Sequence, residues 1–293
     1  MIRIILTLAF VLLAWSGKAA EPITYYSLTG KSTPHLFLIE SWVKEMKKEI
    51  SIDWRPGLSC GGTSSWLEDK KPKIVEFVSG RVWQSLDEDN NDCIIDYKNL
   101  QYISLVEYYY DICVPHDSKI KNVHDIIAHK KLTMAHGSGT ALHKWAGELN
   151  RLYGSNVKPI AFKASGDAML ATLSGDTDFA FVSTLIADQN LKSGKIRCIA
   201  STMPNQDNSL NKLLPKINVL LNNHVNLFPL ASAGLDQRTL QLAKQSVKKA
   251  SAQFELPKGL KIYLVENKEE DNQIKEKVRS QIEQLHQYTK NLR

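Results

Sequence analysis

Three loops of small and hydroxyl-bearing residues are the parts of this sequence best suited to bind a negatively charged group. Each follows a predicted strand and opens a predicted helix: residues 29–33 (TGKST), 136–140 (HGSGT) and 163–167 (KASGD). The first-turn N–H groups of a helix have no acceptor within the helix and carry partial positive charge. A carboxylate or phosphate binds there readily, and glycine lets the backbone approach it. We therefore predict a site for a small anion at these loops.

One such loop, taken alone, is more often a tight turn that caps a helix. Three loops in the same topological position favour a binding site, because open α/β sheets bind ligands beyond the C-terminal ends of their strands. A phosphate-binding loop of the Walker type is excluded at Lys31-Ser32, since Tyr25 stands where that motif needs its first glycine.

Catalysis would have to use a histidine together with an acid or a nucleophile. Ser138 lacks the upstream glycine of a serine-hydrolase elbow, and no H-E-x-x-H or other metal-ligand spacing occurs. A histidine at the start of a helix is more often a hydrogen-bonded surface residue. We therefore predict no enzyme, no metal and no cofactor. The histidines weighed for catalysis are His116, His124, His129, His136 and His143.

The elements that must position these loops alternate between strand and helix over short connections. Such alternation predicts an α/β fold with mostly parallel, doubly wound sheets. Residues 64–92 show no clear pattern. The predicted elements are strand 22–27, helix 35–50, strand 52–55, a β-rich run 100–114, helix 124–130, strand 131–135, helix 141–153, strand 157–162, helix 168–174, strand 178–183, helix 185–193, strand 196–201, helix 237–254, strand 261–265 and helix 268–292.

The first 19 residues are typical of a cleavable signal peptide. Arg3 precedes an apolar run at 4–15, and small residues at 16–20 allow cleavage after Ala19. The run is shorter than the roughly 20 residues that span a bilayer. Without a cysteine near the cleavage site, a lipoprotein is not expected. The sequence thus predicts secretion into the periplasm.

Charge and length narrow the class further. The net charge is +6, and removing Arg3 and Lys18 with the signal peptide leaves +4, a mild excess that suits a small anionic ligand. Lys and Arg are scattered without interleaved aromatics, so nucleic acid is not an expected partner. The mature chain of about 270 residues suffices for two lobes of roughly 100–150 residues.

Four cysteines fall into two environments. Cys113 and Cys198 lie in apolar, strand-like runs and are interpreted as small core residues. Cys60 and Cys93 lie in polar stretches, and an oxidising compartment permits a disulfide between them. The Cys60–Cys93 bridge is the pairing we expect, with four free thiols as the alternative.

From about Leu100 to Met203 the chain resembles the substrate-binding proteins of tripartite tricarboxylate transporters, the Bug family. The matching segments are LTMAHGSGTALHKWAGEL, IAFKASGDAMLATLSGDTDFAFV and LKSGKIRCIASTM. ITYYSLTGKST and WRPGLSCGGT stand where the family has its two N-terminal glycine-rich elements. The order and spacing of these segments carry the resemblance, which covers roughly half of the mature chain.

The resemblance implies a type II periplasmic binding fold, with two α/β lobes, a two-strand hinge and a carboxylate in the cleft. We expect lobe one at residues 20–114 and 226–293 and lobe two at 115–225. The crossings would lie near Val114–Pro115 and Val225–Phe228. Carried over by position, the ligand-binding residues would be Thr29, Gly30, Ser32, Thr33, Ser138, Gly139, Thr140, Ser165, Gly166, Asp167 and Ser183.

The chain also departs from the family pattern. Lys31 brings a positive charge where the family usually has a second glycine and an acidic residue, which favours a more anionic ligand. Ser183 stands where the family often has an acidic or amide residue. The ligand therefore need not be one that the family usually binds.

The resulting prediction is a monomeric solute-binding protein that captures a small organic anion for membrane transporter subunits. The alternative is a ligand sensor or scaffold that presents its closed form to a membrane signalling partner. Two permease genes nearby would favour uptake, whereas an adjacent histidine kinase would favour sensing.

Overall fold

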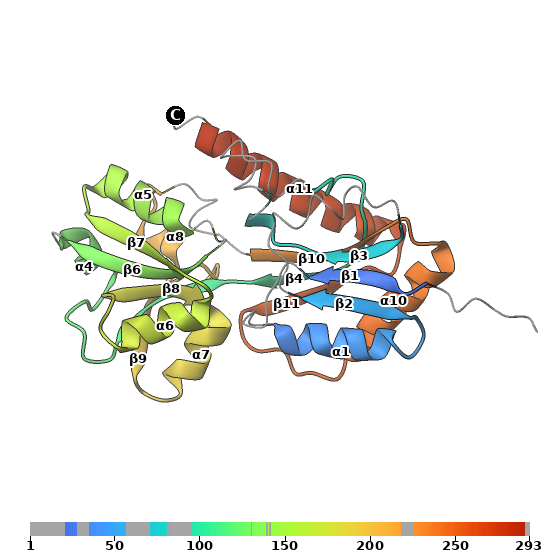
Figure 1. Cartoon of the computed structure of the whole chain (residues 1–293). Helices are drawn as coiled ribbons and strands as arrows, with labels where there is room; N and C mark the ends of the chain where they lie inside the picture. Colours follow the sequence, from blue (N-terminus) through green and yellow to red (C-terminus); the bar gives the residue numbers. More distant parts are fainter. Residues whose placement is uncertain are drawn as a thin grey trace, which may run out of the picture.

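The described part of the protein, seen here as a computed structural model, contains two β-sheets, each with its own helices. Figure 1 shows the two sheets side by side, with β4 continuing from one toward the other. The structure describes residues 21–27, 35–56, 71–80, 82, 95–129, 131–138, 140, 142–217 and 226–290. The predicted signal peptide lies outside these residues.

The first sheet has six strands in the order β11-β4-β10-β3-β1-β2. Strand β1 runs parallel to β2 and β3, whereas β10 is antiparallel to β3 and β4, and β11 is antiparallel to β4. The strands are β1 (Ile23–Ser27), β2 (Ile52–Pro56), β3 (Lys73–Glu76), β4 (Gln101–Tyr108), β10 (Asn226–Ala233) and β11 (Leu260–Leu264), and the helices beside them are α1 (Leu36–Met46), α10 (Gln237–Ser251) and α11 (Lys268–Lys290).

The second sheet has five strands in the order β7-β6-β8-β5-β9. Strand β6 is parallel to β7 and β8, and β5 is antiparallel to β8 and β9. The strands are β5 (Tyr110–Pro115), β6 (Leu132–Gly137), β7 (Val157–Phe162), β8 (Phe179–Ser183) and β9 (Ile196–Ser201), and the helices are α4 (Val123–Ala128), α5 (Leu142–Tyr153), α6 (Ser165–Leu173), α7 (Thr184–Leu191) and α8 (Leu210–Leu213).

Local sequence explains most of these elements. In α1, the apolar residues that recur at helical spacing are buried, among them Leu38, Trp42 and Met46, and they form the face that packs into the core. Helix α4 begins with a capping box, in which Asn122 accepts from the main chain of Asp125 and Asp125 accepts from that of Asn122. The predicted α/β fold is confirmed.

The passage from the first sheet to the second lies at Tyr109. Strand β4 ends at Tyr108 in the first sheet, and β5 begins at Tyr110 in the second. The passage is therefore earlier than the predicted Val114–Pro115, because the single β-rich run contains two strands that are both buried and look alike in sequence. The return passage falls between Ile217 and Asn226, where residues 218–225 are not described.

A disulfide joins Cys113 of β5 to Cys198 of β9. The interpretation of these two cysteines as unbonded core residues is wrong. They stand directly opposite each other on antiparallel neighbours although 85 residues separate them in sequence. Strand order brought them together, and composition could not reveal it. The predicted partners Cys60 and Cys93 lie outside the described residues.

Candidate functional site

The register of the strands shows which ends of the two sheets lie nearest the passage at Tyr109. In the second sheet, Tyr110 stands opposite Ser183, the last residue of β8. In the first sheet, Glu76 at the end of β3 stands opposite Leu230, four residues along β10 from its start. The C-terminal ends of the parallel strands of both sheets therefore point toward the passage, as Figure 1 shows for β1 and β2. This is where an open α/β sheet binds its ligand.

The loop after β6 is held by main-chain groups of the neighbouring strand. The Ser138 N–H donates to the Phe162 carbonyl over 2.7 Å, and the exposed Ser138 hydroxyl donates to the Lys163 carbonyl over 3.3 Å. A Cβ atom built on Gly137 would come within 3.1 Å of the Ser165 nitrogen. Glycine thus lets the end of β6 approach the start of α6, which brings the predicted residues Ser138 and Ser165 together.

Thr140 is buried, and its hydroxyl donates to the Gly137 carbonyl over 2.8 Å. The Thr140 hydroxyl proton is therefore used within the loop, although the sequence predicted that this hydroxyl would donate to the ligand. Gly166, in the first turn of α6, has open space where a side chain would begin, and Asp167 beside it is exposed. Gly139 lies outside the described residues.

Ser183 carries a buried hydroxyl at the end of β8. Its side chain is fully buried, and within the described part of the chain its oxygen has no hydrogen-bond partner. Ser183 also occupies the N-cap position of α7 without making a side-chain cap. Buried hydroxyls are nearly always hydrogen-bonded, so the Ser183 hydroxyl is an unused donor at this strand end.

Two histidines flank the loop after β6. The buried His136 donates from Nδ1 to the Gly137 carbonyl over 3.0 Å, and burial lowers the pKa of His136. His143 uses its Nδ1 on the Thr140 carbonyl over 3.1 Å, and the two rings stack with centroids 6.1 Å apart. Both side chains brace the loop.

In the first sheet, three fully buried polar side chains meet at the ends of β1 and β3. The Glu76 carboxylate accepts from the Ser27 hydroxyl over 2.5 Å and is bonded to His35 Nε2 over 2.7 Å. Ser27 ends β1, and His35 directly precedes α1. The predicted ligand residues Thr29, Gly30, Ser32 and Thr33 fall between them, outside the described residues.

A continuous run of aromatic rings connects this group to the second sheet. His35 packs edge-on against Phe228 at 4.5 Å, and Phe228 stacks on Tyr108 at 4.8 Å. Tyr108 contacts Tyr110 at 5.9 Å across the passage at Tyr109. The run continues through Phe181 to Trp145 of α5. The two sheets therefore share one continuous cluster of aromatic side chains beside Tyr109.

The pairing of His35 with Glu76 was not predicted from the sequence. Residues 64–92 gave no clear pattern, so β3 was not predicted, although a lone glutamate in the apolar run Ile74-Val75-Glu76-Phe77 was a usable signal. A carboxylate in a buried strand requires a hydrogen-bonding partner. Which partner it has depends on strand order, which the sequence did not give.

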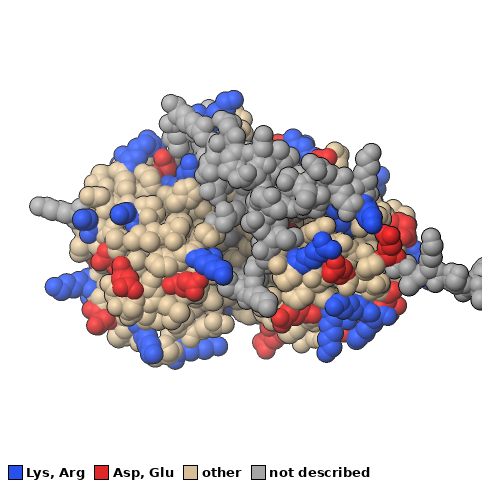
Figure 2. All heavy atoms as spheres, in the orientation of Figure 1, with Lys and Arg blue, Asp and Glu red and all other residues tan. Residues whose placement is uncertain are grey.

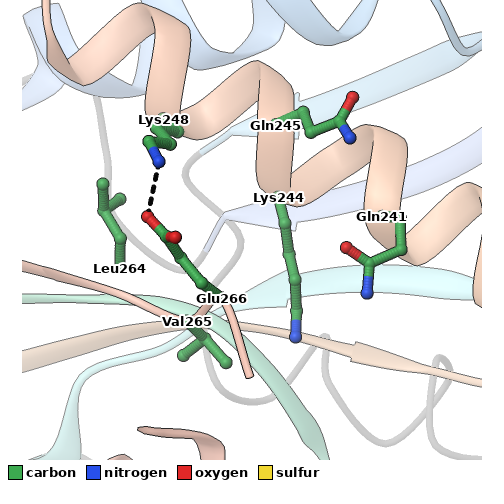
Figure 3. A pocket seen from close by; sticks show the side chains of 7 residues that line it. All are labelled: Gln241, Lys244, Gln245, Lys248, Leu264, Val265 and Glu266. Carbon is green, nitrogen blue, oxygen red and sulfur yellow. Dashed lines mark hydrogen bonds and ion pairs between the residues drawn. The ribbon is translucent and has the colours of Figure 1, made fainter. Parts of the chain in front are cut away.

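A separate pocket lies at the end of the first sheet away from Tyr109, between α10 and the residues at and after the end of β11 (Figure 3). Leu264 pairs with Ser104, at the end of the β11–β4 ladder away from Tyr108, so this pocket is remote from the strand ends described above. Lys248 and Glu266 form an ion pair of 2.7 Å at its rim. Its lining residues are Gln241, Lys244, Gln245, Lys248, Leu264, Val265 and Glu266.

Charges of both signs are interspersed on the face of the molecule in Figure 2. Among the described residues, no cluster of three or more His, Cys, Asp or Glu side chains could hold a metal ion. Nor does that part of the chain contain a helix long and apolar enough to cross a membrane.

Comparison with known proteins agrees with this architecture. Among solved structures, the periplasmic binding protein BugD is 18% identical, with a TM-score of 0.70 over 92% of this chain and 97% of its own. MatC from Rhodopseudomonas palustris with bound malate is 15% identical, with a TM-score of 0.68 over 92% and 98%. A second R. palustris protein, with adipate, is 13% identical, with a TM-score of 0.66 over 92% and 97%. These likenesses establish a shared fold.

No protein of the curated collection matches the chain. The family model described as the tripartite tricarboxylate transporter family receptor matches residues 92–290, which is more than half of the chain. With the fold and the order of its loops in agreement, this chain belongs to the tripartite tricarboxylate transporter receptor family.

Proposed function

We propose that this protein is a periplasmic receptor that binds a small carboxylate between the strand ends of its two sheets and delivers it to membrane transporter subunits. The observation that carries the proposal is the buried, unpaired Ser183 hydroxyl at the end of β8. It stands at the edge where the Ser138 and Ser165 loops also end. A hydroxyl donor and helix N–H groups are what a carboxylate requires.

The described residues of the proposed site all belong to the second sheet and its loops. The N–H groups at the start of α6, Ser165 to Asp167, have no acceptor within the helix. Gly166 leaves open space above them, so a carboxylate can approach the main chain. The exposed Ser138 hydroxyl can turn from the Lys163 carbonyl to the ligand, because their bond of 3.3 Å is long. Thr140 supports this loop from inside.

Ligand capture in this arrangement requires the two sheets to approach each other about the two passages that join them, one of which is at Tyr109. A ligand favours the closed form only through contacts that the open form lacks. The first-lobe contacts come from the predicted residues Thr29, Gly30, Ser32 and Thr33. With Gly139 they complete the proposed set, and the lobes are those predicted from the sequence, with the first boundary moved to Tyr109.

Malate and adipate are bound by two proteins of the same fold, and we propose a di- or tricarboxylate for this chain as well. The proposed receptor binds its ligand without changing it. Serine-hydrolase chemistry is the competing function to test, because residues 57–61 (GLSCG) match the G-x-S-x-G pattern after β2. Ligand recovered intact after long incubation, and no hydrolysis of carboxylic esters, would support binding alone.

The experiment is calorimetry of the purified mature protein with malate, adipate, citrate and the monocarboxylate butyrate. We expect at least one di- or tricarboxylate to bind. Ser183→Ala should weaken that ligand about tenfold, since a hydrogen bond to a charged group contributes roughly 1.5–3 kcal/mol. It should leave the unliganded fold unchanged, because within the described residues this hydroxyl bonds nothing.

Gly166→Val provides a second, steric test. No atom lies within 4 Å of the position where its Cβ would stand, so the free protein tolerates the side chain, but the bound carboxylate would meet it. Gly147→Ala on the exposed face of α5 is the matched control, since its Cβ also meets nothing. If Gly166→Val binds the ligand as well as Gly147→Ala does, the proposed site is wrong.

A further inference from the structure

The group formed by Ser27, Glu76 and His35 has no part in the ligand contacts proposed above. All three side chains are fully buried, and Glu76 lies on β3 between β1 and β10 in the middle of the first sheet. A buried carboxylate loses its hydration and must regain hydrogen bonds within the protein. Among the described residues, the Ser27 hydroxyl donates to Glu76 over 2.5 Å and His35 Nε2 is bonded to it over 2.7 Å.

The two described partners of Glu76 come from the two ends of one connection. Ser27 is the last residue of β1, and His35 directly precedes α1, so one carboxylate joins the end of the strand to the start of the helix. The His35 backbone carbonyl also accepts from Leu38 and Ile39 in the first turn of α1. The position of His35 therefore fixes where the helix begins.

The surroundings of His35 restrict it further. Its ring packs against Phe228 at 4.5 Å and Tyr108 at 5.8 Å. Its Nδ1 is buried and has no partner among the described residues. An unpaired nitrogen lone pair is better tolerated in a protein interior than an unpaired N–H. The favoured tautomer thus carries its proton on Nε2 and donates it to Glu76.

We propose that Glu76 is a positioning residue for ligand binding, because its carboxylate holds the end of β1 and the start of α1 at the separation that the first lobe needs to contact the ligand. The proposal rests on the proposed function, and it assigns Glu76 no contact with the ligand. Both tethered ends lie at the edge of the first sheet that faces the passage at Tyr109. A shift of either end would move the first-lobe contacts relative to Ser138 and Ser183.

The test compares Glu76→Leu, Glu76→Gln and Ser27→Ala in the full mature chain. Leucine has a similar size but accepts no hydrogen bond, so it releases both ends. Glutamine can accept from His35 through its carbonyl oxygen and donate its amide N–H to the Ser27 oxygen, so it preserves both links. Ser232→Ala is the matched control, because Ser232 is a fully buried serine of the same sheet whose hydroxyl, among the described residues, bonds only the Gln101 carbonyl, over 3.4 Å.

Two measurements are made on each variant: calorimetric affinity for malate, adipate and citrate, and hydrogen–deuterium exchange of peptides covering the end of β1 and the first turn of α1. We expect Glu76→Leu to weaken binding about tenfold or more and Ser27→Ala somewhat less, with faster exchange at both ends. Glu76→Gln should remain within about threefold of the wild type. Ser232→Ala should change neither property.

The outcomes separate the two proposals. A wild type that binds and a Glu76→Leu variant that binds equally well would overturn the positioning role and leave the proposed function standing. A wild type that binds none of the acids would refute the proposed function and, with it, the positioning role of Glu76. Unchanged exchange at the start of α1 in Glu76→Leu overturns the proposal, whereas faster exchange that Glu76→Gln reverses supports it.

Discussion

Two buried carboxyl groups lie on either side of Tyr109, one in each sheet, and their pKa values shift in opposite directions. Burial by itself raises the pKa of Glu107 in β4, but the hydrogen bond and charge of Lys277 bring it below its usual range, with help from Tyr109 and Tyr263. Asp111 in β5 is also buried, and burial raises its pKa to about 6. Its hydrogen bond from Ser201 and the charge of Lys258 oppose this shift, and the charge of Asp188 adds to it.

The difference shows that the two sheets are stabilised by different means where they meet. The first sheet is tied to α11 by an ion pair and hydrogen bonds around Glu107, Lys277 and Tyr263. The second sheet holds its antiparallel strands together covalently through Cys113 and Cys198. It has no described cation in contact with Asp111. The stability of the first sheet should therefore depend on the charges of Glu107 and Lys277. The stability of the second sheet should depend on the redox state of its disulfide and on protonation of Asp111.

The largest effect is expected from removing the disulfide. Cys113→Ala together with Cys198→Ala, or reduction of the wild type, should destabilise the protein by about 2–5 kcal/mol, because the bridge closes an 85-residue separation. The measurement is unfolding in urea with and without reductant. Tryptophan fluorescence from Trp145 on α5, beside the second sheet, and from Trp42 on α1, beside the first, should show the larger loss of stability on the Trp145 side when compared through single Trp→Phe variants. Equal losses of stability at Trp145 and Trp42 would contradict the proposed difference between the two sheets.

An intermediate effect is expected from Lys277→Met, which leaves Glu107 buried without its cation. We expect a loss of about 1–3 kcal/mol, less than for a fully buried pair because Lys277 is 39% exposed. In the wild type the folded-state pKa of Glu107 is lowered, so its contribution is present at neutral pH and lost as pH falls below about 4. Lys277→Met should abolish this acid sensitivity.

The control for that variant is Lys98→Met. It removes the surface ion pair of 2.8 Å between Lys98 and Glu283, which lies on α11 as Lys277 does. Both of its partners are exposed, and such pairs contribute about 0–1 kcal/mol. A loss in Lys98→Met as large as in Lys277→Met would mean that burial of Glu107 is not the cause.

The smallest effect is expected from Asp111→Asn. The folded-state pKa of Asp111 is raised to about 6, so the native state binds the proton more tightly than the unfolded chain does. Stability from this group is therefore full below pH ~4 and is lost as pH rises through about 6. Asp111→Asn should remove this slope and raise stability by about 1–2 kcal/mol at pH 7–8. Identical pH profiles for variant and wild type would show that Asp111 does not differ from an exposed carboxyl.

Much of the fold followed from local sequence. The helix predicted at 268–292 spans 268–290, and the strands predicted at 157–162 and 196–201 have those bounds. Helices and strands in which apolar residues recur at a regular spacing were predictable, because that spacing is a local property of the sequence. The β-rich run 100–114 was not divided correctly, because two buried strands separated by one residue have no polar face to mark the boundary.

The candidate site divides in the same way. The loops with Ser138 and Ser165 were predicted as ligand loops because small residues between a strand and a helix are a local signal, and the structure brings the two loops together through Gly137. Ser183 was named as well. Its burial without a hydrogen-bond partner is a property of the packed molecule. The acceptor that Thr140 uses inside its own loop could not be known from the residue type.

The sequence by itself determined the α/β pattern, the small-residue loops at strand ends and the resemblance to a carboxylate-receptor family, since each depends on neighbouring residues. Only the tertiary structure decided that Cys113 bonds Cys198, that Glu76 joins Ser27 to His35, and that the chain changes sheets at Tyr109. These contacts join residues separated by 85, 49 and 41 positions. Strand order sets such distances, and strand order results from burying all the apolar faces at once.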